Sequence, residues 1–377
     1  MPKPRSKTVE ADVIKALRAQ VPLRQLGGVR ITDVEDVPGR PYDVRFQLEL
    51  GGSRIPVFGE IKARLSPKTA EEIAPWITRL RAIRPDSAFV VVSPYLTPQT
   101  QDFCVENGID FIDLTGNVSI NMPGKIVLRR LGMKGKEPRS SSQPTGIVGV
   151  YSGRSSRVLR VLLQKPGAWS LTKIADELAA ETRRNPVAGG GSFQISLGSI
   201  SKVLATLEEE LLIRRRNSTI LVPEPRRLLT RWAEKYRERY RWRLRSAFTC
   251  PNPFGSQPRE VSKGLDSIAA GSYALTGAAA ASIDAPFVDI DCVEVFIADR
   301  DRGAAFRQLT DRTSTGAKLR FIYPYDLGVF MYARIVEGVP LVAVVQMYLD
   351  LYARGGRDLK QAEYLLENRI VPAWRPE

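Results

Sequence analysis

The sequence predicts a multidomain α/β protein, because three kinds of pattern follow one another along its 377 residues. Helical and extended periodicities alternate over residues 1–132, helical periodicity dominates residues 155–245, and both kinds mix over residues 246–377. With 43% hydrophobic residues, the chain can build two or three cores. We therefore expect an α/β sandwich, a basic linker over residues 133–154, a helical module and a C-terminal α+β domain.

The N-terminal segment has the element order of an α/β sandwich. Helical spacing from Val9 to Leu17 is followed by three extended stretches, and the later elements alternate between helix and strand. The extended stretches are Val29–Val34, Asp43–Leu50 and Ile55–Lys62, and the later elements are a helix over Thr69–Ala82, a strand over Ala88–Val92, a helix from Thr97-Pro98 and a strand over Ile109–Leu114.

The charge and the residue types narrow the possible functions. The 56 lysines and arginines exceed the 41 acidic residues by 15, so nucleic acid is the expected partner. The chain has no histidine, which excludes triads built on histidine and zinc sites that contain it. The three cysteines, Cys104, Cys250 and Cys292, are too widely spaced for a metal knuckle and indicate a reducing compartment. No segment resembles a signal peptide or a membrane span, so we expect a cytoplasmic protein.

A hairpin in the N-terminal segment brings two acidic residues together. With a two-residue turn at Gly51-Gly52, paired residues have numbers that sum to 103, so Asp43 lies opposite Glu60. Side chains alternate along a strand, so Lys62 shares the face of Glu60. Two opposed carboxylates repel unless a cation lies between them, and Mg²⁺ would suit such a pair. Lys62 could then orient or deprotonate a water for phosphodiester attack.

An alternative is that this hairpin simply has one wet face. Its basic residues would then neutralise its acids, with Arg45, Arg54 and Lys62 facing Asp43, Glu49 and Glu60. Pro56 adds a second alternative, because a bulge there would shift the register and turn Asp43 toward the apolar side.

The arrangement Asp43, Glu60-Ile61-Lys62, on a hairpin preceded by a helix and followed by helix and strand, resembles the PD-(D/E)XK nuclease fold. The resemblance implies a restriction-endonuclease-like domain in which Asp43 and Glu60 bind the metal and Lys62 is the catalytic lysine.

Residues 155–245 have the element order of a winged helix-turn-helix. Helices over Ser155–Leu163, Ser170–Ala180 and Ser196–Ile213 precede three arginines and a strand, Thr219–Val222. The third helix has an inner apolar stripe that consists of Leu197, Ile200, Val203, Leu204, Leu207 and Leu211. Its outward positions would face bases or phosphates; they are Ser199, Ser201, Lys202 and Thr206.

Further DNA contacts are expected around this helix. Arg214, Arg215 and Arg216 form a basic wing, and each phosphate that they neutralise adds salt-dependent affinity. Thr172 and Lys173 begin the second helix. A basic loop of about fifteen residues between Ala180 and Ser196, where a turn of three or four is usual, contains Arg183 and Arg184. The alternative is a winged helix that serves as a protein-interaction module.

An arginine-rich helix is expected over Arg226–Arg245. Its aromatic residues could form a packing stripe, and its arginines could face either solvent or phosphate; the pattern leaves both open. The aromatic residues are Trp232, Tyr236, Tyr240 and Trp242.

Several phrases of the sequence are similar to the AbiEi-like family of type IV toxin-antitoxin transcriptional regulators. They are Val91-Val92-Ser93-Pro94-Tyr95-Leu96, Gly108-Ile109-Asp110-Phe111-Ile112-Asp113-Leu114-Thr115-Gly116-Asn117, Tyr273-Ala274-Leu275-Thr276-Gly277 and Val345-Gln346-Met347-Tyr348-Leu349-Asp350-Leu351. The resemblance implies DNA binding through the winged helix, autoregulation of an operon and, for antitoxin members, antagonism of a nucleotidyltransferase toxin.

Three functions follow from these observations. The first is a transcriptional regulator that binds specific sequences of double-stranded DNA. It could act as a homodimer and needs no cofactor. The second is a Mg²⁺-dependent endonuclease that the winged helix targets to DNA. The third is a protein-interaction adaptor.

Overall fold

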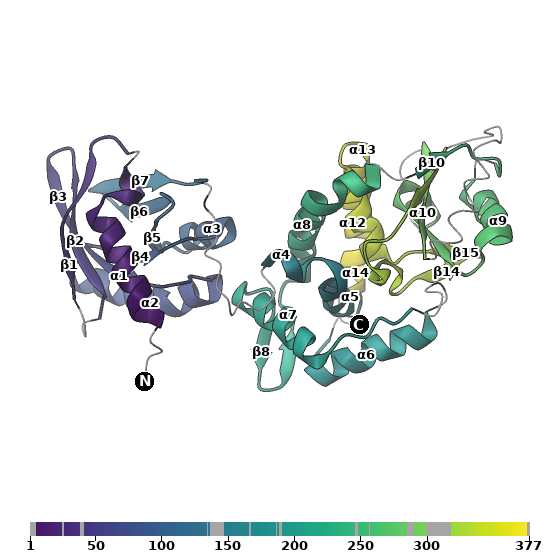
Figure 1. The fold of residues 1–377 in the computed structure, drawn as a ribbon, viewed down its shortest axis with the longest axis horizontal. Helices are drawn as coiled ribbons and strands as arrows, with labels where there is room; N and C mark the ends of the chain where they lie inside the picture. Colours follow the sequence, from purple (N-terminus) through teal and green to yellow (C-terminus); the bar gives the residue numbers. More distant parts are fainter. Residues whose placement is uncertain are drawn as a thin grey trace. The chain divides into compact units, whose positions relative to one another are not determined.

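The computed structural model describes residues 5–24, 26–37, 41–133, 135, 147–165, 167–185, 187, 191–245, 248–255, 257–284, 290–298 and 318–374. The chain forms two compact units, a first that includes Met1–Gln143 and a second that includes Pro144–Glu208 and Leu212–Glu377 (Figure 1). Most of the expected linker, residues 134 and 136–146, lies outside the described residues. Within the described ranges, no helix is both long and apolar enough to span a membrane.

The first unit contains one mixed sheet, whose strands lie in the sheet in the order β1 to β7. Strands β3, β4 and β5 are parallel to one another, and the other neighbours are antiparallel. The predicted order of elements is found, and the strands β6 and β7 extend it. The elements are α1 (Arg5–Arg18), β1 (Val29–Asp36), β2 (Val44–Leu50), β3 (Ser53–Ile61), α2 (Pro67–Ile83), β4 (Ala88–Ser93), α3 (Pro98–Glu106), β5 (Asp110–Asp113), β6 (Val118–Met122) and β7 (Ile126–Arg130).

Helices cover both faces of this sheet, because its strands alternate between two apolar sets of side chains. One set packs with Val13, Ile14 and Leu17 of α1 and includes Val44, Phe46, Val57, Ile61 and Val92. The other packs with Ala70 and Ile77 of α2 and Cys104 of α3 and includes Phe58, Phe89, Val91 and Phe111. The first unit is therefore an α/β/α sandwich (Figure 1).

The second unit begins with helices and a two-stranded sheet and ends with a mixed α/β part. The first group is α4 (Ile147–Val150), α5 (Ser156–Gln164), α6 (Leu171–Arg184), α7 (Leu197–Glu209), β8 (Arg214–Arg216), β9 (Thr219–Leu221) and α8 (Pro225–Arg245). The second group is β10 (Phe248–Cys250), α9 (Pro258–Ala269), β11 (Tyr273–Thr276), α10 (Gly277–Asp284), β12 (Cys292–Ile297), β13 (Lys318–Ile322), β14 (Arg334–Val336), β15 (Val339–Leu341), α12 (Val344–Arg354), α13 (Arg357–Leu365) and α14 (Val371–Ala373). Its described strands form a sheet in the order β10-β13-β12-β11-β15-β14.

The alanine-rich segment Tyr273–Ile283 has a helical composition, but its first four residues form a strand. Tyr273–Thr276 form the buried strand β11, which pairs with β12 on one side and β15 on the other. Gly277 then adopts a φ of 64°, a conformation that favours glycine, and the helix α10 begins there.

The second unit has one continuous apolar core, which runs from Val150 in α4 to Ile370. The aromatic stripe of α8 lies in this core, since Trp232, Tyr236 and Tyr240 are all buried, whereas Trp242 is 59% exposed. The packing interpretation therefore holds for three of the four aromatic residues. The helices α5–α7 and the C-terminal part share a core instead of having one each.

Candidate functional site

The β2–β3 hairpin has the register that its two-residue turn predicts. Gly51 and Gly52 adopt φ values of 56° and 84°, as a tight hairpin turn requires. Val44 pairs with Gly59 and Gln47 pairs with Pro56, with no bulge along the ladder. The backbone N–H of Asp43 donates to the carbonyl oxygen of Gly59 at 2.9 Å, which places Asp43 next to the end of this ladder. The last pair of the ladder is Val44–Gly59, so the alternative of a bulge at Pro56 is wrong, and the facing of Asp43 and Glu60 beyond that pair stays a prediction.

The Asp43 carboxylate is held at the end of the hairpin by one main-chain hydrogen bond. The backbone N–H of Ile61 donates to Asp43 Oδ2 at 2.7 Å. Burial raises the pKa of Asp43, and the negative charges of Glu60 and Glu10 raise it further, against the lowering effects of the Ile61 hydrogen bond and of Lys62. The carboxylate thus lies in a region with an excess of negative charge.

Lys62 lies beside Glu60, as the alternation along the strand predicts. Its Nζ atom is 2.7 Å from Glu60 Oε1, and the two side chains are 33% and 23% exposed. The backbone N–H of Lys62 donates to the carbonyl oxygen of Val92, so β4 fixes the point where β3 leaves the sheet. Asp43, Glu60 and Lys62 therefore come together at one end of the central strands.

The wet-face alternative accounts for only part of this hairpin. Arg54 lies 2.6 Å from Glu49 and Lys62 lies 2.7 Å from Glu60, as that interpretation expects. Arg45, however, pairs with Glu35 of β1 at 3.7 Å. The Asp43 carboxylate accepts a hydrogen bond from the backbone N–H of Ile61, and among the described residues no arginine forms an ion pair with it.

Glu10 is a member of this site that the sequence analysis missed. It belongs to α1, is half-buried and interacts electrostatically with Asp43. Glu10 is 33 residues before Asp43, so the local pattern of the hairpin cannot identify it. Only the packing of α1 on the sheet brings the two residues together. In the sequence, Glu10 lies three and four residues before the apolar Val13 and Ile14, which indicates that it shares the side of the helix that packs on the sheet.

The residues present fit a magnesium ion bound mainly through water. Among the described residues, no group of three or more His, Cys, Asp or Glu side chains is arranged to hold a metal ion. Mg²⁺ usually takes one or two carboxylates and keeps several waters, and Asp43 and Glu60 can supply two oxygen ligands of this kind. A cation bound there would offset the repulsion between Asp43 and the negative charges of Glu60 and Glu10.

The second unit contains the three predicted helices, α5, α6 and α7, followed by the strands β8 and β9. The strands β8 and β9 pair antiparallel, and Trp169 forms an isolated antiparallel bridge with Ile220 of β9. The backbone N–H of Trp169 donates to the carbonyl of Ile220 at 3.0 Å, and the N–H of Ile220 donates back at 2.7 Å. The α7 residues Ile200, Val203, Leu204 and Leu207 are buried as predicted, whereas Leu197 is 50% exposed and does not belong to the inner stripe.

Most of the predicted DNA-contact residues are on the surface. Ser196 caps α7, accepting a hydrogen bond from the backbone N–H of Ser199 at 3.2 Å. Ser201 is half-buried. The exposed members are Thr172, Lys173, Arg183, Arg184, Ser199, Lys202, Arg214 and Arg216.

Three of the predicted contact residues have partners within the second unit. Thr206 is buried, and its hydroxyl donates to the carbonyl of Lys202 at 3.1 Å, so it does not face outward. Arg184 pairs with Glu177 and Glu181 of its own helix and lies over the Tyr332 ring. Arg215 is half-buried and lies 3.3 Å from Glu208.

The loop between the second and third helices is shorter than expected. The helix α6 continues to Arg184, so Arg183 and Arg184 are helical and not part of a loop. Val187 and Phe193 are buried in the core of the unit and anchor the connection. The glycines at positions 189 and 190 lie outside the described residues.

Comparison with known proteins assigns no family. No protein-family model and no curated protein matches the chain. A search of solved structures finds a partial likeness to EndoMS in its apo form, at 16% sequence identity and a TM-score of 0.21. That alignment covers 30% of this chain and 47% of the EndoMS chain.

Proposed function

We propose that this chain is a Mg²⁺-dependent DNA endonuclease whose winged helix binds the duplex. The observation that carries the proposal is the convergence of Asp43, Glu60 and Lys62 at one end of the central strands of an α/β/α sandwich. Two acidic oxygen donors next to a lysine can bind a divalent ion and a phosphodiester together. The PD-(D/E)XK-like arrangement seen in the sequence is supported by this geometry.

The proposed reaction adds water across a P–O bond of the DNA backbone, which leaves a phosphate on one strand end and a hydroxyl on the other. Bound Mg²⁺ would supply charge neutralisation and a more acidic water. The Ile61 N–H fixes Asp43 Oδ2 and leaves the other carboxylate oxygen for the ion. The Lys62 ammonium, held beside Glu60, can donate to the attacking water or to a phosphate oxygen and stabilise negative charge on the phosphate.

Duplex DNA is the substrate that the second unit supports. The helix α7 exposes Ser199 and Lys202 on its outer face, and the wing exposes Arg214 and Arg216. Small polar side chains on a third helix with cations on a wing are typical of major-groove and backbone contacts.

Plasmid cleavage tests the proposal. Supercoiled plasmid is incubated with the full chain and Mg²⁺ or Mn²⁺, beside Glu60→Gln and Lys62→Ala. The matched control is Glu49→Gln, an acid of the same hairpin that pairs with Arg54 away from the site. We expect nicking or linearisation by the wild type and the control, and loss in both site variants and in EDTA. Absence of cleavage with every metal, or equal cleavage by the site variants, would contradict the proposal.

A DNA-binding transcriptional regulator is the second candidate, and the exposed residues on α7 and the wing favour it. In this function the first unit would be a scaffold or an extra DNA contact, and the nucleotidyltransferase toxin implied by the AbiEi-like resemblance would be a possible partner. A specific footprint in EDTA, together with no cleavage under any metal, would select this candidate. A protein-interaction adaptor would show neither footprint nor cleavage.

A further inference from the structure

The arginine-rich helix α8 divides into two halves that differ in charge pairing. In its first half each basic side chain has an acidic partner: Arg226 pairs with Glu367, Arg227 with Glu224, Arg231 with Glu234 and Lys235 with Glu238. In its second half, no acidic group of the described residues forms an ion pair with Arg237, Arg239, Arg241 or Arg243. Four positive charges within seven residues thus lack a protein counterion in the described part of the chain.

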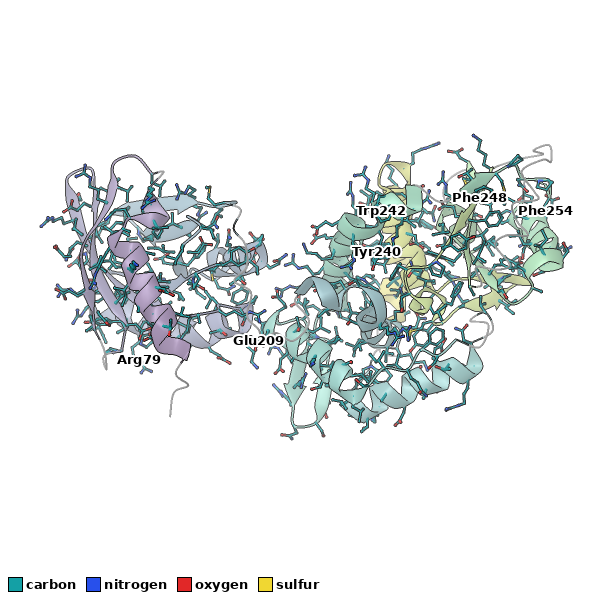
Figure 2. The ribbon with its side chains drawn as sticks, in the orientation of Figure 1. Arg79, Glu209, Tyr240, Trp242, Phe248 and Phe254 are labelled. Carbon is teal, nitrogen blue, oxygen red and sulfur yellow. The ribbon has the colours of Figure 1, made fainter. Side chains whose placement is uncertain are left out.

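A large aromatic ring lies among these arginines at the surface. Trp242 is 59% exposed, and the Arg243 guanidinium lies 5.2 Å from the centre of its ring. Arg239 is three residues before Trp242 and four before Arg243, so helix geometry makes the three side chains neighbours. We call Arg239, Trp242 and Arg243 the α8 patch; Figure 2 shows Trp242 and Tyr240 on this part of the helix.

The α8 patch lies over a pair of stacked tyrosines. Tyr240 is buried beneath it and stacks on Tyr325, with ring centres 3.9 Å apart and planes at 21°. The guanidinium groups of Arg239 and Arg243 lie 5.9 and 6.0 Å from the Tyr240 ring. The helix end therefore presents its cations and its indole in a defined arrangement, because the side chain under them is part of the core.

We infer that the α8 patch binds single-stranded nucleic acid, with a base stacked on Trp242 and the adjoining phosphates paired with Arg239 and Arg243. An indole that is 59% exposed can stack with a base, and arginines without an acidic partner among the described residues can pair with a phosphate backbone. The bases of a duplex already stack on each other, so a strand with unpaired bases is the better match. A protein partner would have to supply several acids to neutralise this surface. The site goes beyond the duplex binding and cleavage proposed above and does not depend on either.

Fluorescence anisotropy with the full chain in EDTA tests this inference. The probes are labelled dT15, rU15 and a 15-base-pair duplex, and the variants are Trp242→Ala, Trp242→Phe and the pair Arg239→Gln with Arg243→Gln. The matched control is Arg227→Gln with Lys235→Gln, which removes two charges from the paired half of the same helix. Thermal unfolding checks that each variant is folded.

We expect Trp242→Ala to weaken dT15 binding roughly 10-fold and Trp242→Phe to retain most of the affinity, because base stacking tolerates another aromatic ring. The arginine pair should weaken binding and reduce the slope of log K against log salt by about 1.4, about 0.7 for each phosphate. Similar affinities for dT15 and rU15 would agree with contacts to base and phosphate alone. A clear preference for one of the two probes would identify single-stranded DNA or RNA as the ligand. An unchanged dT15 affinity in folded Trp242→Ala, an equal loss in the control, or no dT15 binding by the wild type would overturn the inference. Cleavage plays no part in these measurements, so a chain without nuclease activity could still pass them.

Discussion

Asp43 Oδ2 accepts a hydrogen bond from the backbone N–H of Ile61 at 2.7 Å, so the carboxylate at the start of β2 is tied to the end of β3. Asp43 therefore has a role in holding the hairpin as well as the proposed role in binding metal, and two substitutions distinguish them. Asp43→Asn keeps an oxygen that can accept the bond but loses the negative charge. We expect it to lower Mg²⁺-dependent cleavage by about 100-fold or more while the unfolding midpoint changes little. Asp43→Ala should lose activity and also about 1 kcal/mol of stability. Equal cleavage by Asp43→Asn and the wild type would refute the metal role.

The raised pKa of Asp43 predicts a pH dependence of metal binding. Its burial and the charges of Glu60 and Glu10 make this carboxyl hold its proton to a higher pH than an exposed aspartate does. A protonated carboxyl binds a cation poorly, so Mn²⁺ affinity should fall as the pH is lowered through that raised pKa. Glu10→Gln removes one of the two negative neighbours and should move this fall to lower pH. Titration calorimetry with Mn²⁺ at several pH values measures the affinity of the wild type and of Glu10→Gln. The same pH dependence of affinity in the two proteins would contradict the electrostatic coupling of Glu10 and Asp43.

The wing arginines should differ in their effect on DNA binding. Arg214 and Arg216 are exposed, whereas Arg215 is half-buried beside Glu208. The double change Arg214→Ala with Arg216→Ala should weaken duplex binding and lower the salt slope by up to about 2, since each phosphate contact contributes about 0.9. Arg215→Ala should have a smaller effect on the slope. Duplex affinity at several salt concentrations tests this, and a larger loss from Arg215→Ala alone would reverse the assignment.

The buried pair Arg157–Asp326 should stabilise the second unit only as long as both partners are present. Arg157 Nε and Nη2 donate to the two Asp326 oxygens at 2.8 Å each, and the side chains are 5% and 8% exposed. Asp326→Ala leaves a buried guanidinium without its counterion and should cost about 3–5 kcal/mol. Arg54→Ala, which breaks the exposed pair with Glu49, should cost less than about 1 kcal/mol. Urea unfolding measures both, and similar losses would show that the buried pair has no special cost when broken.

Asp350 predicts a second pH effect, this time on stability. Burial raises its pKa from 3.8 to about 6, against the lowering effect of hydrogen bonds from Thr276, Tyr236 and Gln346. The folded state therefore binds a proton between these pH values that the unfolded state has released, and this contribution to stability is lost as the pH rises from 3.8 to about 6. Asp350→Asn should remove this decrease in the free energy of unfolding with rising pH. Unfolding midpoints of the two proteins across this range test it; parallel profiles would contradict the prediction.

The local pattern of the hairpin was sufficient to predict its register and the proximity of Asp43, Glu60 and Lys62. A two-residue glycine turn defines the register, and alternation along each strand defines the face, so both depend only on neighbouring residues. The same holds for the order of the first unit's elements and for most of the buried stripe of α7, which follow from periodicity. The strands β6 and β7 and the strand at Tyr273–Thr276 were not predicted, because their pairing partners determine them.

The roles of individual charges were decided by tertiary structure. Arg184 and Arg215 looked like DNA contacts, but nearby glutamates on the folded surface pair with them. Glu10 joined the candidate site only because α1 packs against the sheet. Sequence periodicity determines which residues are apolar and which secondary structure they form, because those are short-range properties. Whether a charged side chain is paired, buried or exposed depends on groups that are distant in sequence, and only the packed fold brings those groups within a few ångströms.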